Sequence, residues 1–497
     1  MADWARVFER SVGPRRAADG LQCIAEIRDA VGAGQLDPAA TLAESAARHE
    51  ATHAAINAVV QSRFAAAAAD ARAGRTGPLA GVPICVKDCF AVAGMRTTVG
   101  LGSRRNAVDA TDAPLVARLV AAGALVVGKT NVPQALLLHE TVNPVWGRTN
   151  HPQDPARSPG GSSGGDAAAV AAGVVPLGLG NDLAGSLRQP AHACGIATLM
   201  PRSQVLGEGG AFDTLPHLTT VRPRAGFLAR TVADLRLAAA AVGVPATAEP
   251  RRLAIGWWDD AGPIPGSPAI RRGVREAVER LAAAGASVRP LTGGLAREAA
   301  WLMMAIVSAD GGADIRRLFA GERPIRGVAR LMALARMPRG VRPLVAAFAR
   351  LVGRGIEAEA LGRTGPRDAA GLTGLLAARA ALRERFMAEL SGLDVLVCPV
   401  SALPALRHDT AARLVLAAAP CLLANLLDLP AGAVPVTHVR FDEEGDRGFP
   451  FDPVLRAAAA CDRGSRGLPV GVQVVGGPAA DEAVVLDAMQ AIENGPA

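Results

Sequence analysis

The chain has 497 residues, with 53 Lys and Arg against 46 Asp and Glu, and a formal net charge of +7 at pH 7. Over this length, so small a positive excess does not by itself indicate nucleic-acid binding, and the sequence has no zinc finger, RNP motif or basic–aromatic interleaving. Half of the residues are hydrophobic, yet no apolar run reaches the roughly 18 residues that a membrane span needs. Seven cysteines without a CxxC spacing favour reduced thiols in a cytoplasmic protein.

The N-terminal part of the chain predicts helices rather than a targeting segment. Residues 1–20 are charged throughout and lack the apolar stretch of a signal peptide. Residues 20–75 show helical spacing of apolar side chains, for example at Leu42 and Ala46 and again at Ile56 and Val59. We therefore expect an N-terminal helical arm over residues 1–75 and a catalytic domain over residues 76–497.

From residue 78 onward, the pattern predicts alternating strands and helices. Strands are expected at 78–86, 124–131, 174–180, 253–256, 395–398 and 470–475, and helices at 115–119 and 167–172. Such alternation is typical of an α/β fold, here a single large domain with a mixed central sheet covered by helices on both faces. Functional sites in these sheets gather at strand ends.

Two serines beside glycines stand out along this pattern. Ser162 lies in the run 159–165, Pro-Gly-Gly-Ser-Ser-Gly-Gly, and Ser186 follows 24 residues later in Ala-Gly-Ser-Leu-Arg. A Gly/Ser run alone is more often a flexible linker. The apolar stretch 167–179 follows at once, however, which places these serines at the start of a buried helix.

A serine hydroxyl needs an adjacent base to act as a nucleophile. The histidine nearest to Ser186 in the sequence is His192, and its surroundings offer no Asp–His pair, although it stays an alternative base. Lys87 follows an apolar strand 75 residues before Ser162. A lysine in that place is usually solvated, but a buried one loses its proton more readily and can serve as a base.

Three segments, 81–88, 159–165 and 179–190, resemble the amidase signature family in order and spacing. The resemblance implies a Ser-Ser-Lys triad in which Lys87 accepts a proton from Ser162, whose peptide bond is cis, and Ser162 accepts one from Ser186. It also implies an acyl-enzyme intermediate and no cofactor or metal. The implied oxyanion hole consists of the backbone N–H groups of Leu183, Ala184, Gly185 and Ser186. The residues expected to support this site are Ser163, Asp182 and Arg188.

The same segments depart from the commoner family pattern Thr-Asp-x-Gly-Gly-Ser at two positions. Asn181 replaces the threonine and Ala184 replaces the first of the two glycines. Alanine at position 184 would be strained if its φ were positive, and would otherwise only narrow the acyl site.

Further segments, 128–134, 143–149 and 427–437, resemble the fatty acid amide hydrolase branch of this family, and 467–473 is similar across all of it. The resemblance implies an amidase that acts on a small-molecule substrate, a linear amide with a long or bulky apolar acyl or amine part such as a fatty-acyl group. Two alternatives stay open: a glutamine-hydrolysing subunit of an amidotransferase assembly, and a homologue repurposed for biosynthetic acyl transfer. A homodimer is also left open.

Residues 323–354 contain eight arginines and no acidic residue, with apolar side chains between them, so we expect these arginines to be unopposed. Pro-Arg-Gly at 338–340 divides the segment into two short predicted helices. Such a hairpin can lie on an anionic membrane surface, and the resemblance implies a membrane-binding helical cap here. We therefore expect a cytoplasmic protein with peripheral membrane contact; the alternative is a cap that packs on its own enzyme with its arginines extended to water.

Overall fold

The computed structural model describes residues 23–247, 251–260, 262–445, 447–448 and 450–495. The N-terminal stretch 1–20, in which no signal peptide is expected, lies outside the described residues. No helix of the described ranges combines the length and the apolar character that crossing a bilayer requires.

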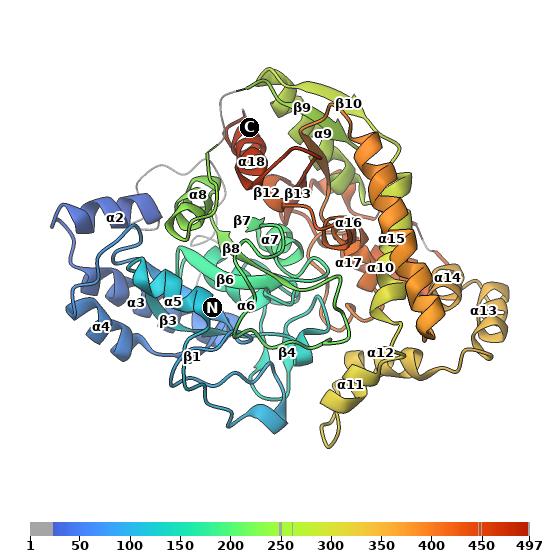
Figure 1. The fold of residues 1–497 in the computed structure, drawn as a ribbon, viewed down its shortest axis with the longest axis horizontal. Coiled ribbons are helices and arrows are strands. Elements are labelled where there is room, and N and C mark those ends of the chain that lie inside the picture. The colour runs from blue at the N-terminus through green and yellow to red at the C-terminus, as the bar shows by residue number, and fades with distance from the viewer. Residues whose placement is uncertain (1–22, 248–250, 261, 446, 449, 496–497) are drawn as a thin grey trace.

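A mixed sheet of eleven strands forms the centre of the molecule (Figure 1). Its spatial order is β1 (Val59–Ser62), β3 (Leu125–Thr130), β2 (Pro83–Lys87), β6 (Leu177–Asp182), β8 (Arg224–Ala229), β7 (Ala197–Met200), β12 (Ala431–His438), β13 (Pro469–Gly476), β11 (Val395–Pro399), β9 (Ala254–Trp257) and β10 (Ser287–Pro290). Strands β3, β2 and β6 are mutually parallel, and the pairs from β6 through β8, β7, β12 and β13 to β11 are antiparallel. A separate hairpin pairs β4 (Val142–Asn143) with β5 (Gly147–Arg148).

Helices cover both faces of this sheet. Alternate residues of one strand enter two different apolar cores: Ile84 and Val86 of β2 belong to one core, whereas Cys85 belongs to the other. The first core includes residues of α2 (Ile24–Gly32), α5 (Pro114–Ala121), α8 (Val232–Ala241), α9 (Pro268–Ala283) and α18 (Glu482–Asn494). The second includes residues of α4 (Phe64–Arg72), α6 (Gly164–Ala171), α7 (Arg188–Cys194), α10 (Gly294–Val307), α15 (Ala369–Glu389) and α16 (Ala419–Leu427). The predicted fold class is confirmed.

The N-terminal arm differs from its prediction in one element. Helices α3 (Pro38–Ile56) and α4 are present, but Val59–Ser62 is the edge strand β1, antiparallel to β3. Asn57 has a positive φ of 55° and ends α3, so the apolar residues that follow leave the helical spacing. Through β1, the first part of the chain joins the central sheet.

Residues 313–363 form four helices at the rim of the molecule, drawn in yellow in Figure 1. They are α11 (Ala313–Leu318), α12 (Arg326–Arg336), α13 (Arg342–Leu351) and α14 (Gly355–Arg363), and α17 (Pro453–Asp462) follows later in the chain. The break between α12 and α13 falls at 337–341, as the Pro-Arg-Gly sequence predicts.

The expectation of unopposed arginines in this segment is wrong. Arg330 and Arg354 both form ion pairs with Glu357, and Arg342 is buried and donates to backbone carbonyls. Glu357 lies in α14, three residues beyond the end of the segment at residue 354. The turn after α13 brings it next to these arginines.

Candidate active site

Lys87 is the last residue of β2, a strand whose five residues are all buried. Its Nζ lies 2.7 Å from Ser162 Oγ, 2.8 Å from Asn181 Oδ1 and 3.2 Å from the Asn181 carbonyl oxygen. The side chain has no exposed surface, and burial lowers the pKa of Lys87, opposed by nearby anionic groups. The structure thus places a buried lysine side chain, whose pKa is lowered, next to the hydroxyl of Ser162.

Ser162 and Ser163 precede α6, at the edge of the sheet where β2, β3 and β6 end. The peptide bond between Gly161 and Ser162 is cis. Ser163 N donates to the Ser186 carbonyl at 3.1 Å, and Ser163 Oγ donates to the Asn181 carbonyl at 3.3 Å. Ser163 therefore ties the loop that carries Ser186 to the start of α6.

Ser186 follows β6 in the loop before α7 and is 8% exposed. Within the described residues, its hydroxyl makes no hydrogen bond, so no hydrogen bond joins it to Ser162. Gly185 has a φ of 100°, and a Cβ there would lie 3.0 Å from the Cβ of Cys421, so this position requires glycine. Ala184 is not among the described residues of positive φ, so the alanine in this loop is not strained in the way considered above.

The four backbone N–H groups of this loop are not equivalent. Gly185 N donates to Asp182 Oδ1 at 2.7 Å and is thus already engaged. Those of Leu183, Ala184 and Ser186 have no partner within the described part of the chain. The N–H of Gly185 can bind an incoming oxyanion only if it gives up its hydrogen bond to Asp182. The other three N–H groups can bind the oxyanion without breaking a hydrogen bond.

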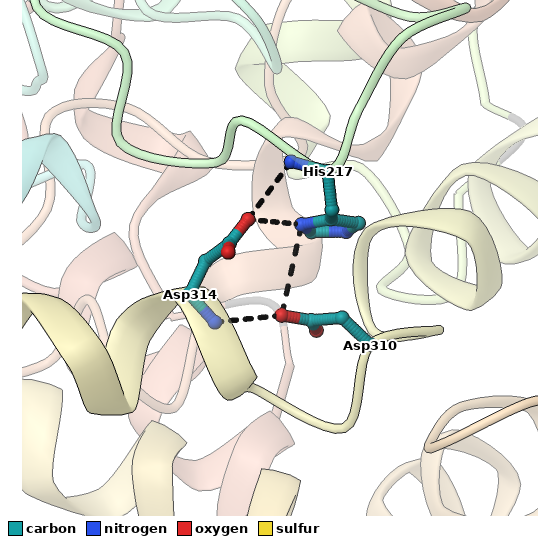
Figure 2. Close-up of side chains that lie close together, drawn as sticks. All are labelled: His217, Asp310 and Asp314. Atoms are coloured by element: carbon teal, nitrogen blue, oxygen red, sulfur yellow. Dashed lines mark hydrogen bonds and ion pairs between the residues drawn. The ribbon is translucent and has the colours of Figure 1, made fainter.

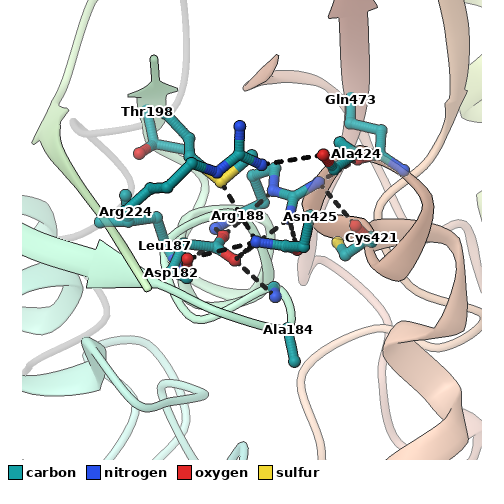
Figure 3. A network of polar contacts seen from close by, with 12 residues as sticks. Asp182, Ala184, Leu187, Arg188, Thr198, Arg224, Cys421, Ala424, Asn425 and Gln473 are labelled. Atoms are coloured by element: carbon teal, nitrogen blue, oxygen red, sulfur yellow. Dashed lines mark hydrogen bonds and ion pairs between the residues drawn. The ribbon is translucent and has the colours of Figure 1, made fainter. Parts of the chain in front are cut away.

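Asp182 and Arg188 form a buried ion pair under the loop, with Nε and Oδ2 3.0 Å apart (Figure 3). Asp182 also accepts from the N–H groups of Gly185 and Leu187, and from Asn425 Nδ2 at 3.0 Å. Burial alone opposes ionisation, but the guanidinium and these donors hold the pKa of Asp182 well below its usual range. The pair shapes the loop and does not touch Ser186 Oγ.

We expect Arg188→Met to destabilise the fold, because it leaves the Asp182 carboxylate buried without its cation. Removing one partner of a buried pair costs about 3–5 kcal/mol. Since the pKa of this carboxylate is lowered, its contribution is present above the unfolded-state pKa and is lost as pH falls through the folded one. Urea unfolding at pH 7 measures the loss. Arg275→Met, which breaks the more exposed pair with Asp259, is the control and is expected to cost far less.

The histidines near the site are engaged elsewhere. His192 Nδ1 accepts from Gly471 N at 3.0 Å, and its Nε2 lies 3.0 Å from the Leu403 carbonyl. His139 Nε2 lies 3.1 Å from the Ala184 carbonyl, and burial lowers the pKa of His139 to about 4. Neither imidazole makes a hydrogen bond to Ser162 or Ser186, so the alternative base His192 has no geometric support.

A pocket reaches both serines from the surface. Ser162, Asn181 and Ser186 lie in its wall, and the apolar lining is Leu136, Leu137, Leu183, Phe212, Leu215 and Pro223, with Asp213 and Thr214 beside them. The sequence patterns did not indicate residues 212–215, because this segment lies between strands and carries no motif. The pocket offers a mostly apolar surface to whatever approaches Ser186.

A second polar cluster connects α11 to the segment between β7 and β8, which includes residues 212–215 of the pocket wall (Figure 2). His217 Nδ1 lies 2.7 Å from Asp314 Oδ2 and 3.6 Å from Asp310 Oδ2. The three residues have the composition of a metal site, but their oxygens are already used: Asp310 accepts from Gly312 N and Asp314 N, and Asp314 pairs with Arg317. The cluster serves as an anchor between residue 217 and α11.

Comparison with known proteins adds to this geometry. The model of the amidase family, described as "Amidase", matches residues 40–485. A fatty-acid amide hydrolase 1 of Sus scrofa is 32% identical over 434 residues, 82% of this chain and 74% of that protein. One subunit of the glutamyl-tRNA(Gln) amidotransferase of Deinococcus radiodurans is 30% identical over 488 residues, 92% of this chain and 98% of that protein.

Among solved structures, a fatty acid amide hydrolase superposes with a TM-score of 0.80 at 22% identity, covering 98% of this chain and 88% of that one. At that identity the likeness concerns the fold. It agrees with the central sheet and its helical layers described above.

Proposed function

Because the chain belongs to the amidase family and is an amide-hydrolysing enzyme, we propose that Ser186 attacks the amide carbonyl and that Ser162 and Lys87 remove its proton. The observation that carries the proposal is the buried contact of 2.7 Å between Lys87 Nζ and Ser162 Oγ, with Ser186 in the wall of the same pocket.

The hydrogen bonds of Lys87 suit a neutral amine. A neutral amine has two N–H donors and one lone pair. Asn181 offers two acceptors, its carbonyl and its side-chain oxygen, which leaves the lone pair for the Ser162 hydroxyl. Ser162 then donates to Lys87 while accepting the proton of Ser186, and the acyl group is transferred to Ser186 Oγ.

The developing oxyanion would be bound by backbone N–H groups at Leu183, Ala184 and Ser186. Each donor in such a hole contributes about 3 kcal/mol to the transition state. The N–H of Gly185 instead holds the loop through Asp182. The leaving amine takes the proton back from Ser162, and water hydrolyses the acyl-enzyme by the reverse relay.

The substrate class that we propose is a linear amide with a long or bulky apolar acyl or amine part. The support is the apolar lining of the pocket beside Ser186 and the similarity to fatty-acid amide hydrolases. The similarity to the amidotransferase of Deinococcus radiodurans supports a second candidate, a glutamine-hydrolysing subunit.

An acyl anilide panel separates the two candidates. We expect the purified chain alone to release aniline from apolar acyl anilides, with kcat/KM rising with the apolar area of the acyl group. Turnover of glutamine in preference to these anilides, or activity that depends on partner proteins, would favour the second candidate.

We also propose that the α13 patch contacts anionic membranes. Leu344, Phe348 and Leu351 follow one face of α13 and are 73%, 64% and 83% exposed. Phe451, 91% exposed, lies beside Gly353 at the end of this helix. We define these four apolar residues as the α13 patch. Large exposed apolar side chains next to arginines are typical of surfaces that insert into the interface of a bilayer.

Phe348→Glu combined with Leu351→Glu is expected to abolish binding to anionic vesicles and to slow hydrolysis of long-chain amides, while short amides are cleaved normally. Inserted carboxylates are repelled by the lipid headgroups and lose the apolar contact. Vesicle sedimentation at low and high salt measures the effect. The matched control is Phe441→Glu, an exposed phenylalanine outside the patch. Equal vesicle binding by the double variant and the control would leave the patch without this role.

A further inference from the structure

Asn181 links the candidate base to a carboxylate. Its Oδ1 accepts from Lys87 Nζ at 2.8 Å, and its Nδ2 donates to Glu208 Oε2 at 3.4 Å. A carboxylate accepts hydrogen bonds and an ammonium or amine N–H donates them. Glu208 on one side and Lys87 on the other therefore select the same orientation of the Asn181 amide. In this orientation its oxygen faces the lysine.

The segment between β7 and β8 holds Glu208 in this place. Phe212 N donates to the Cys89 carbonyl at 2.7 Å, and Ala91 N donates to the Gly210 carbonyl at 2.9 Å. These bonds join the segment to residues just beyond Lys87. Oε1 of Glu208 is buried and has no hydrogen-bond partner within the described residues, so the carboxylate is held there at a cost in solvation.

We propose that Glu208 is a positioning residue for amide hydrolysis: it orients the Asn181 amide toward Lys87, and its negative charge raises the pH above which Lys87 works. This inference rests on the proposed role of Lys87 as base. Neither Asn181 nor Glu208 belongs to the implied triad, and Asn181 is a departure from the commoner threonine.

The charges around Lys87 indicate the direction in which Glu208 shifts the pH dependence of this lysine. The ionisable groups near Lys87 are Cys89, Asp166, Asp182, Glu208 and His139. Burial raises the pKa of Glu208 to about 7, and its other charged neighbour is Arg224. An ionised Glu208 stabilises the ammonium form of Lys87 and so raises the pKa of the lysine. Removal of this charge should let Lys87 lose its proton at lower pH.

The experiment follows the rate at which a fluorophosphonate labels the full chain between pH 5 and pH 10, with wild type, Glu208→Gln and Glu208→Leu. Glutamine keeps an acceptor for Asn181 Nδ2 but removes the charge, whereas leucine removes both. We expect the acid limb of both variants to move to lower pH. The labelling rate on the high-pH plateau should fall about tenfold in Glu208→Leu, which corresponds to the loss of one charged hydrogen bond. It should fall by less than about threefold in Glu208→Gln.

A second pair of variants tests the route through the amide. In Asn181→Thr, which has no amide to orient, adding Glu208→Leu should lower the plateau by less than about twofold, while the acid limb still moves. Unchanged plateau and limb in Glu208→Leu, or an unmoved limb in Glu208→Gln, would overturn the inference. If Glu208→Leu does not fold, the acid limb of Glu208→Gln alone decides the inference. If wild-type Ser186 is not labelled at all, the proposed function itself fails.

Discussion

Replacing Ser186 with alanine is expected to abolish amide hydrolysis. The variant removes the only atom proposed to form a bond to the substrate carbonyl, and the neighbouring Ser162 is oriented toward Lys87 by a contact of 2.7 Å. Loss of a nucleophile that acts as part of a unit costs on the order of a millionfold in kcat. The measurement is steady-state hydrolysis of an apolar acyl anilide.

Because Ser186 Oγ makes no hydrogen bond within the described residues, the same variant should unfold at nearly the temperature of wild type. Thermal unfolding therefore serves as its control. Ser103→Ala, at an exposed serine in the short 3-10 helix Gly102–Arg104 and outside the pocket, is the matched substitution and should keep wild-type turnover. Turnover within tenfold of wild type in Ser186→Ala would assign the nucleophile to another residue.

Lys87→Ala is expected to lower kcat/KM by several orders of magnitude. The base is lost, and Ser162 has no other proton acceptor within the described structure. In the wild type, burial lowers the pKa of Lys87, so the active, deprotonated fraction grows as pH rises and activity falls on the acid side. A pH profile of kcat/KM measures both effects.

Near-normal turnover in Lys87→Ala would show that another group is the base. His192→Gln provides the comparison: this imidazole contacts the backbone of residues 403 and 471, so its loss should affect stability more than the pH profile. A profile whose acid limb disappears in His192→Gln but persists in Lys87→Ala would contradict the proposed roles.

The resemblance to the amidase signature family implied that Lys87, Ser162 and Ser186 form one site, whereas local patterns predicted only that such residues lie at strand ends. Lys87 ends β2 and Ser186 follows β6, and these two strands are adjacent and parallel, so their carboxyl ends lie at one edge of the sheet. Apolar alternation and glycine-rich turns determine such elements within a few residues of sequence. The sequence did not predict that these two strands are neighbours; the strand order of the structure shows this and accounts for the closeness of the two residues.

Long-range partners could not be predicted in the same way. Asn425 is 243 residues from Asp182, and only the packing of α16 against the loop brings its amide to the carboxylate. Val59 continued a helical spacing of apolar residues, and short apolar runs fit a helix or a strand equally well until a neighbouring strand is available to pair. Glu208 lies in a segment without a motif, so its place beside Asn181 follows only from the tertiary structure.

Covalent labelling tests the central claim most directly. The full chain is incubated with a fluorophosphonate, digested, and analysed by mass spectrometry to locate the adduct. The proposed relay predicts a single adduct on Ser186 Oγ, formed faster as pH rises through the range where Lys87 loses its proton, and absent in Ser186→Ala. An adduct on a different residue, or labelling of Ser186 at the same rate in Lys87→Ala, would contradict it.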